Sequence, residues 1–302
     1  MAGVPRTMVV FGGTGFLGRR LVRDLREHGF AVRVAVRHPE RAKALFEKSL
    51  FPQGTLITPM RADVEDEASI APVLTGAWGV VNAVSLYAEK GGRTFHGVHV
   101  ESAARVAAMA HRAGVQRLIQ LSGIGADPHA RSAYVRSRGQ GEAAVVAAFP
   151  AAIVIRPSAM FAAEDGFTAS IAGMMHKTSV FPLFGTGSTR LQPVFVDDVA
   201  EAIARIMEAA SPAPLYEFGG PEALTYKALL QTIARQRGRR PLLLPVPFAV
   251  WRLLAAVAEW LPKPPLTEGM VALVRQDNVV SGQWPGFDAL GIAPKSLAIV
   301  LG

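Results

Sequence analysis

The sequence predicts an α/β protein built on a doubly wound parallel sheet, with a smaller mixed α/β lobe at its C-terminal side. Three observations support this fold class. Short apolar runs alternate with stretches of helical periodicity over roughly the first half of the chain. A glycine-rich turn joins the first apolar run to the first helical stretch. Polar side chains follow the ends of later runs, where ligands bind in folds of this class.

Each predicted element follows from this alternation. We expect strands at Thr7–Phe11, Ala31–Val36, Leu56–Met60, Gly79–Val84, Arg117–Leu121 and Ala152–Ile155, and helices near Gly15–His28, Pro39–Lys48, Ile70–Leu74, Gly97–Ala113 and Ala133–Ala148. Strands separated by helical crossovers form a parallel sheet.

The pattern changes after Arg156 to mixed helix, short strands and Gly/Pro loops, with a loop at Phe181–Ser188 and a helix at Val199–Ala210. We therefore expect a dinucleotide-binding domain over residues 1–156 and the smaller lobe over 157–302, with some segments of the lobe returning to the sheet.

Composition excludes several classes of protein. The chain has 302 residues, 50% hydrophobic, and no cysteine, which rules out thiol catalysis, Cys-ligated zinc and iron–sulfur clusters. The apolar stretch Phe248–Leu261 is shorter than the roughly 20 residues that span a bilayer. The N-terminus has no signal-peptide or transit-peptide pattern. We expect a cytoplasmic protein.

The net charge of +8 lies mainly in the first half. Residues 1–150 hold 19 Lys+Arg and 12 Asp+Glu, hence +7, whereas residues 151–302 hold 13 and 12, hence +1. Such an excess suits nucleic acid, an anionic membrane or an anionic cofactor, and only the positions of the charges distinguish these.

The sequence Gly12-Gly-Thr14-Gly15-Phe16-Leu17-Gly18 follows a predicted strand and opens a predicted helix. Gly12 permits a tight turn, Gly15 lets the backbone approach a pyrophosphate, and Gly18 allows close packing of helix on sheet. The N–H groups at the helix start are oriented toward an anion. This arrangement predicts a dinucleotide site.

Two residues bear on which dinucleotide is bound. The second strand ends at Arg37, where an acidic residue would select a free ribose 2′-hydroxyl and an arginine pairs with a 2′-phosphate. We expect NADP(H), with NAD(H) as the alternative if Arg37 is only a solvent-exposed strand end. Asp63, before Val64, would lie beside the adenine or cap a helix.

A possible catalytic group lies near the fifth strand. Tyr134 precedes Arg138 by about one helical turn, and a cation there would ease loss of the phenol proton, which suits a proton donor to a carbonyl. Tyr134 could equally be an aromatic packing anchor. Ser122 is a weaker candidate that could simply cap its own turn.

Two further groups are interpreted as structural. Asp197 and Asp198 precede a helical pattern, which indicates N-capping and interaction with the helix dipole. His96 and His99 are spaced to share a helix face, but no third ligand lies nearby in sequence, so no metal is predicted.

The segment Arg235–Leu261 joins a basic cluster, ending at Arg240, to an apolar helix. Arg252 and Glu259 would share one face of that helix. It would be buried in its own lobe or docked on a membrane surface or a partner. No groove-reading motif accompanies the arginines, so nucleic acid is not expected.

Several motifs together resemble the extended and atypical short-chain dehydrogenase/reductases, and within them the branch of the Rossmann-fold accessory subunit of respiratory complex I, subunit 9 of the alpha subcomplex, and its bacterial relatives. The motifs are Gly12–Gly18, Tyr134–Glu142, Ile155–Ser158, Gln192–Val199 and Asp277–Ser281. The glycine motif is general to the superfamily, and the last two motifs are more specific to this branch.

The resemblance implies roles for individual residues. The glycines hold the pyrophosphate, Arg37 holds the 2′-phosphate, Asp63 and Val64 lie at the adenine, and Asn82, Ala83 and Val84 lie toward the nicotinamide. Further cofactor-binding residues are Thr14, Phe16, Leu17, Tyr134, Arg138 and Pro157. The chain departs from the family in two places. Arg138 stands where the family has lysine, and Ile124 stands where extended members have the catalytic serine.

Because a guanidinium does not release its proton, Arg138 cannot serve a proton relay. The first hypothesis is therefore an NADP(H)-binding protein whose nucleotide is structural or regulatory, peripheral on the cytoplasmic face of the inner membrane at complex I or another quinone-linked complex. The second is an NAD(P)H-dependent oxidoreductase or sugar-nucleotide-type epimerase/dehydratase that uses Tyr134. A redox-sensing regulator is a third.

Overall fold

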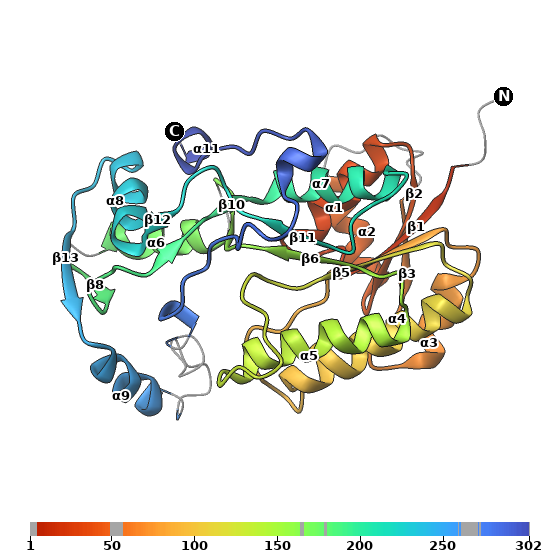
Figure 1. Cartoon of the computed structure of the whole chain (residues 1–302), viewed down its shortest axis with the longest axis horizontal. Coiled ribbons are helices and arrows are strands. Elements are labelled where there is room, and N and C mark those ends of the chain that lie inside the picture. Colours follow the sequence, from red (N-terminus) through yellow and green to blue (C-terminus); the bar gives the residue numbers. More distant parts are fainter. Residues whose placement is uncertain are drawn as a thin grey trace.

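The centre of the molecule is a seven-stranded sheet in the order β11-β6-β5-β4-β1-β2-β3, parallel throughout (Figure 1). The computed structural model describes residues 5–48, 57–163, 166–177, 180–258, 260, 271 and 273–301. The strands are β1 (Thr7–Phe11), β2 (Ala31–Val36), β3 (Ile57–Arg61), β4 (Gly79–Asn82), β5 (Arg117–Leu121), β6 (Ile153–Pro157) and β11 (Leu215–Phe218). The predicted fold class is confirmed.

Helices cover both faces of the sheet (Figure 1). One face packs against α1 (Gly18–Glu27), α2 (Pro39–Lys48) and α7 (Val196–Glu208), and the other against α3 (Glu67–Leu74), α4 (Ala103–Arg112) and α5 (Ala133–Ala148). In β1, Met8 and Val10 face the first layer, whereas Val9 and Phe11 face the second. Because both faces are buried, the central strands are largely apolar, as in Met8–Phe11 of β1 and in Val80 and Val81 of β4.

Some boundaries differ from those predicted. Three of the six strands are displaced at one end or both, and Leu56 lies outside the described residues. The helix predicted over Gly97–Ala113 begins as a π-helix, η1 (Gly97–Ser102), and continues as α4. From the second half of the chain, α7 and β11 return to the sheet, because α7 buries its apolar face against α1 and β11 pairs with β6.

The smaller lobe packs around a core of its own that includes Phe161, Leu183 and Leu229. Its helices are α6 (Gly166–Lys177), α8 (Tyr226–Gln236), α9 (Phe248–Ala258) and α11 (Leu297–Leu301), with a 3-10 turn η2 (Phe287–Leu290) beside the main sheet. Its short strands pair as β7 (Met160–Phe161) with β10 (Val194–Phe195), β9 (Arg190–Leu191) with β12 (Leu224–Thr225), and β8 (Val180–Phe184) with β13 (Leu242–Val246).

The prediction of a loop over Phe181–Ser188 is wrong for its first half, because Val180–Phe184 form the strand β8. Phe181 and Leu183 are buried while their neighbours Val180 and Pro182 are exposed, the alternation of a half-buried strand. The turn itself comes after β8, at two glycines with positive φ, Gly185 and Gly187. Within the described ranges, no helix is long and apolar enough to cross a membrane.

Candidate functional site

The turn after β1 brings the start of α1 against the strand end. Gly12 has φ of +77°, and a Cβ on it would lie 2.9 Å from the carbonyl carbon of Ala83. A Cβ on Gly18 would lie 2.1 Å from the carbonyl oxygen of Gly12. Helix α1 begins at Gly18 without a side-chain N-cap, so its first N–H groups are not occupied by a capping side chain.

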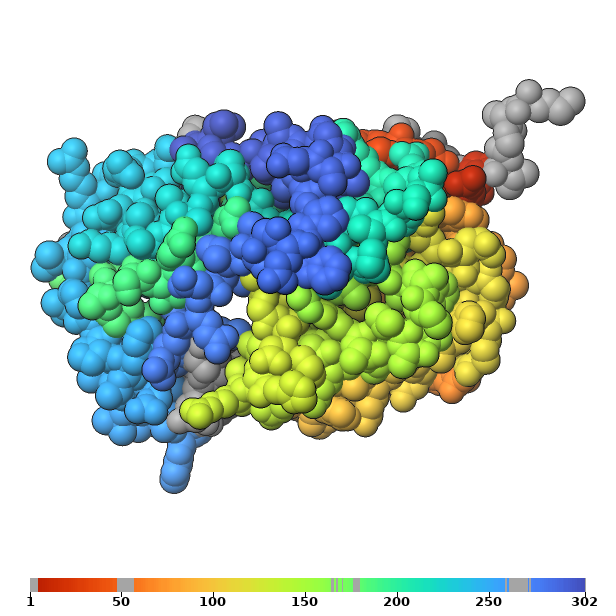
Figure 2. Space-filling view, in the orientation of Figure 1, coloured from red at the N-terminus to blue at the C-terminus, as the bar shows by residue number. Residues whose placement is uncertain are grey.

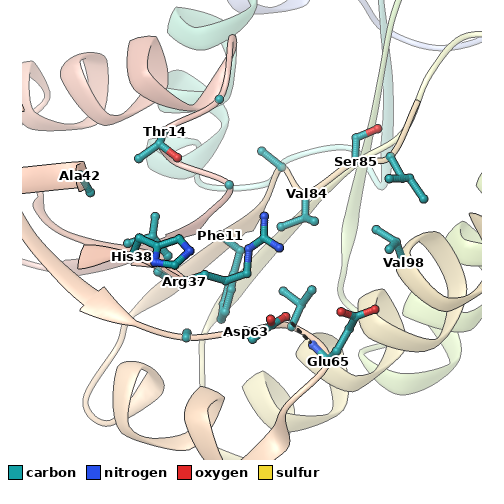
Figure 3. Close-up of a pocket in the computed structure, with 18 of the residues that line it drawn as sticks. Phe11, Thr14, Arg37, His38, Ala42, Asp63, Glu65, Val84, Ser85 and Val98 are labelled. Atoms are coloured by element: carbon teal, nitrogen blue, oxygen red, sulfur yellow. Dashed lines mark hydrogen bonds between the residues drawn. The ribbon is translucent and has the colours of Figure 1, made fainter. Parts of the chain in front are cut away.

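A pocket of about 620 Å³ opens at the carboxyl edge of the sheet, beside this turn (Figure 3). The strand order reverses between β1 and β4, and the pocket lies at that switch point, where open α/β sheets bind ligands. Its walls come from the ends of β1, β2, β3 and β4. Of the predicted site residues, it is lined by Gly12, Thr14, Gly15, Arg37, Asp63, Val64, Ala83 and Val84.

The other predicted site residues do not line this pocket; they are Phe16, Leu17, Gly18, Asn82, Ser122, Tyr134, Arg138 and Pro157. Asn82 is buried, and its amide is used within the sheet: Nδ2 donates to Gln120 Oε1 at 2.9 Å, and Oδ1 accepts from the N–H of Val84 at 3.2 Å. Asn82 thus fixes the backbone of the residues that do line the pocket.

The end of β2 gives the pocket a positive wall. Arg37 and Arg41 both line it, with His38 between them in sequence, and Figure 3 shows the Arg37 side chain extending into the pocket. Among the described residues neither guanidinium has a carboxylate partner. A forked, permanently charged donor without a partner is suited to a phosphate group.

Asp63 does not cap a helix. The N-cap of α3 is Asp66, whose carboxylate accepts from the N–H of Ala68. Asp63 accepts instead from the N–H of Glu65 at 3.2 Å and from Arg93 Nη2 at 3.2 Å. These bonds hold its carboxylate at the wall of the pocket.

Tyr134 and Arg138 form a hydrogen-bonded pair on α5. Arg138 is 8% exposed, and its Nη2 donates to the Tyr134 hydroxyl at 3.2 Å. The same guanidinium donates to the hydroxyl of Ser85, which lines the pocket, and to the carbonyl of Leu121 at 3.1 Å. Arg138 therefore ties the tyrosine to the ends of β4 and β5.

His99 supports this arrangement, a role that sequence reasoning missed. The N–H of Leu86 donates to Nε2 at 3.0 Å, so Nδ1 carries the proton and donates to Ser137 Oγ at 2.9 Å. Ser137 in turn donates to the carbonyl of Tyr134 at 2.8 Å. Burial and the charge of Arg138 lower the pKa of His99 to about 3, so the ring is neutral.

Spacing alone could not have revealed this role, because the partners of His99 come from a loop after β4 and from α5. Both ring nitrogens are occupied by hydrogen bonds. His96 is exposed and shares none of these contacts; its Nε2 lies 3.7 Å from Oε1 of Glu101.

Ser122 does not cap its turn. Its Oγ is buried and has no hydrogen-bond partner among the described residues, although its N–H donates to the carbonyl of Ile155 at 2.8 Å. A buried hydroxyl without a partner carries a desolvation cost.

Asp197 and Asp198 of α7 bind groups of other segments. The N-cap is Phe195, so neither aspartate is the capping residue, although both lie in the first turn, where carboxylates complement the dipole. Asp197 Oδ1 lies 2.6 Å from Arg20 Nε, which joins α7 to α1. Asp198 accepts from the N–H of Lys295 at 2.7 Å.

The segment Asp277–Ser281 ties the two lobes together. Asn278 Oδ1 accepts from Ser158 Oγ at 2.6 Å and from the N–H of Ala159 at 2.9 Å, and its Nδ2 donates to the carbonyl of Ile124. Gln192 Oε1 accepts from the N–H of Val280 at 3.0 Å. These motifs therefore fix the chain around the end of β6.

The chain is similar to a known protein family and to several known proteins. The model of the NAD dependent epimerase/dehydratase family matches residues 8–218. Subunit 9 of the alpha subcomplex of mitochondrial NADH dehydrogenase [ubiquinone] 1 is 31% identical in Arabidopsis thaliana, over 95% of this chain and 74% of that protein. The Mus musculus protein is 30% identical, over 99% and 79%.

Shorter and more distant similarities extend the comparison. A ceramide reductase of Caulobacter vibrioides is 31% identical over 64% of this chain and 58% of its own length. An NADPH-dependent quinone oxidoreductase from Escherichia coli, solved with NADPH, superposes with a TM-score of 0.76 at 21% identity, over 97% of this chain and 98% of that one. The chain belongs to the NAD dependent epimerase/dehydratase family and is related within it to the subunit 9 proteins of complex I.

Proposed function

We propose that the protein binds NADP(H) in the pocket at the carboxyl edge of the sheet. The observation that carries this proposal is Arg37, whose guanidinium extends into the pocket beside Arg41 with no carboxylate partner among the described residues. A 2′-phosphate would supply the missing anion. The adenine would lie against Asp63 and Val64, the pyrophosphate against the turn Gly12–Gly18, and the nicotinamide toward Ala83 and Val84.

The proposed role of the nucleotide is structural or regulatory. Arg138 stands where a lysine would complete a relay behind Tyr134, and a guanidinium is not interchangeable with an ammonium in that role. Ile124 presents an apolar side chain where a catalytic serine would stand, and its N–H donates to the carbonyl of Pro157. The residues that would bind the nucleotide are thus present beside a site that lacks two groups of the usual chemistry.

The proposed location follows the relatives. Two relatives that match 95% and 99% of this chain are named as subunits of the mitochondrial NADH dehydrogenase. We infer a cytoplasmic protein, peripheral on the inner membrane, that associates with complex I or another quinone-linked complex. The segment Arg235–Leu261, of which Glu259 and Leu261 lie outside the described residues, would lie toward that partner.

One experiment tests these points together. The protein is purified from its own host under mild conditions, and the released nucleotide and co-purifying proteins are identified by mass spectrometry. We expect NADP(H) near one equivalent and subunits of a respiratory complex. Release of NAD(H) in quantity contradicts the Arg37 assignment, and recovery of the intact complex from membranes without this chain contradicts the association.

A second candidate function is that of an active NAD(P)H-dependent oxidoreductase or sugar-nucleotide-type epimerase/dehydratase. It is favoured by the Tyr134 hydroxyl, to which the Arg138 guanidinium donates at 3.2 Å, and by the Ser122 Oγ, which has no hydrogen-bond partner in the described part of the chain. The similarity to a ceramide reductase suggests a ceramide-type substrate for the first assay. If the wild type oxidises NADPH with such a substrate, Tyr134→Phe should abolish turnover. Full turnover by the variant would eliminate a tyrosine acid.

A further inference from the structure

Helix α9 has two apolar faces. Its inner face packs on β8: Trp251 Nε1 donates to the carbonyl of Leu183 at 2.9 Å, its ring lies 4.3 Å from that of Phe184, and Ala255 is fully buried. Its outer face is formed by residues at spacings i, i+3, i+4 and i+7, which lie together on a helix. These are Val250, Leu253, Leu254 and Val257, between 43% and 67% exposed.

The outer face continues onto neighbouring residues. Leu242 and Leu244 of β13 are 64% and 51% exposed, and Trp260 is 92% exposed. Of thirteen large exposed apolar side chains in the described part of the chain, seven fall between 242 and 260. We call these seven the α9/β13 surface. Apolar side chains gathered in this way mark an interaction site, whereas scattered ones do not.

The same part of the chain is strongly basic. From Ala223 to Ala258 the sequence holds six cations and no carboxylate, namely Lys227, Arg235, Arg237, Arg239, Arg240 and Arg252. This +6 is three quarters of the net charge of the whole protein, which is +8. The net charge of +1 over residues 151–302 therefore includes a region that is entirely basic.

The cations and the apolar side chains are contiguous. Lys227, Arg235, Arg239 and Arg240 line a pocket of about 580 Å³ together with Leu242, a member of the α9/β13 surface. Figure 2 shows this part of the chain, in light to medium blue, along the left and lower-left margin of the molecule.

We propose that the α9/β13 surface and the adjoining basic pocket dock on an anionic phospholipid bilayer. Apolar side chains enter the boundary between headgroups and acyl chains, and arginines beside them meet lipid phosphates. The helix lies in the interface, because it is too short to span. A partner protein would offer a local patch of carboxylates, whereas six cations spread over α8, α9 and the loop that follows α8 match a uniformly negative surface.

This inference deepens the proposed peripheral location and rests on it: it assigns the α9/β13 surface to the lipid of the membrane rather than to the respiratory complex, and it requires no nucleotide. The full-length protein is sedimented with sucrose-loaded vesicles of phosphatidylcholine alone or mixed equally with phosphatidylglycerol. We expect binding to the anionic vesicles only, a loss of at least about tenfold between roughly 0.05 and 0.5 M salt, and a blue shift of tryptophan fluorescence on binding.

Two double variants separate the contributions. Leu253→Glu with Val257→Glu should abolish the fluorescence shift and vesicle binding, and Arg240→Glu with Arg252→Glu should weaken binding about tenfold or more. Ile299→Glu, at a 72% exposed position on α11, is the matched apolar control, and Lys43→Glu with Arg112→Glu is the matched charge control. Circular dichroism and NADPH affinity verify that every variant is folded.

Three results would overturn the proposal. Equal binding to neutral and anionic vesicles removes the role of the cations. Equal losses in the control variants remove the role of this surface. Absence of vesicle binding by the folded wild type, with or without retention on a solubilised respiratory complex, shows that the surface does not bind lipid and leaves the nucleotide site untouched.

Discussion

Arg138 donates a hydrogen bond to the hydroxyl of Tyr134 across 3.2 Å while its other terminal nitrogen donates to the carbonyl of Leu121. The tyrosine is thus held by a buried cation that also secures the ends of two strands. Arg138→Met would leave these acceptors without a donor, and we expect the free energy of unfolding in urea to fall by about 2–4 kcal/mol. Arg138→Lys keeps the charge and should cost about half as much. An equal effect of both variants would show that the fork of donors, not the charge, matters.

Arg37 is expected to select the nucleotide. Arg37→Ala should weaken NADPH binding by about 10- to 100-fold, the value of one or two charge-assisted hydrogen bonds to a phosphate, and leave NADH binding nearly unchanged. Fluorescence titration with both nucleotides measures this. Arg61→Ala is the matched control, because Arg61 is exposed at the end of the next strand and does not line the pocket. Parallel losses for both nucleotides would contradict selection by Arg37.

Gly18 is required for the close approach of α1 to the turn. A Cβ at this position would lie 2.1 Å from the carbonyl oxygen of Gly12, so Gly18→Ala must displace backbone. We expect loss of nucleotide binding and destabilisation by about 1–3 kcal/mol, seen by titration and thermal unfolding. Gly173→Ala on α6 has open space around it and should be neutral or stabilising by up to about 1 kcal/mol.

His99 should make stability depend on pH in a predictable direction. Its pKa is lowered to about 3 in the folded protein from 6.5 in the unfolded chain, so the unfolded state binds more protons between these values. The stabilisation is complete above about pH 6.5 and is lost as the pH falls toward 3, with a slope of up to about 1.4 kcal/mol per pH unit.

The measurement compares urea unfolding of the wild type and His99→Gln across that range. The variant should be less stable at pH 7, and the difference should shrink as the pH falls. His129→Gln, at an exposed histidine, serves as the control and should run parallel to the wild type. A constant difference between wild type and His99→Gln would show that His99 is not held neutral.

Asn278 joins the end of β6 to the C-terminal segment through three hydrogen bonds, to Ser158, Ala159 and Ile124. Asn278→Ala removes all three, and we expect a loss of about 2–4 kcal/mol in the free energy of unfolding. Gln276→Ala is the control, because the Gln276 side chain is exposed and lies two residues away in sequence. It should change the free energy of unfolding by less than about 0.5 kcal/mol. A small effect at Asn278 would show that its motif does not hold the lobes together.

Much of the nucleotide half was predictable because its signals are local. The strand Thr7–Phe11, the glycine turn and the start of α1 are consecutive in sequence, and steric limits on the backbone fix their geometry with little help from distant residues. The same holds for Arg37 at the end of β2, which enters the pocket because the strand that carries it ends there.

The remaining roles depended on groups that meet only after folding. From the sequence, Ser122 could be a weak catalytic candidate or a cap of its own turn, and Asp63 could lie beside an adenine or cap a helix. In the structure neither residue caps: Asp63 accepts from Arg93 of another segment, and the Ser122 hydroxyl has no partner among the described residues. The Asn82 side chain lies within the sheet because its Nδ2 donates a hydrogen bond to Oε1 of Gln120 on the adjacent strand. Hydrogen-bond partners separated by about 40 residues leave no periodic signal in a sequence.

By itself, the sequence determined the fold class, the position of the dinucleotide turn and the positive residue at the end of β2, because periodicity and glycine sterics act over neighbouring residues. The tertiary structure alone decided that His99 fixes the Tyr134 helix, that α7 and β11 complete the sheet, and that α9 leaves one apolar face uncovered. Burial depends on how the whole chain packs. The residues of an apolar helix alone therefore do not predict which of its faces packs against the rest of the protein.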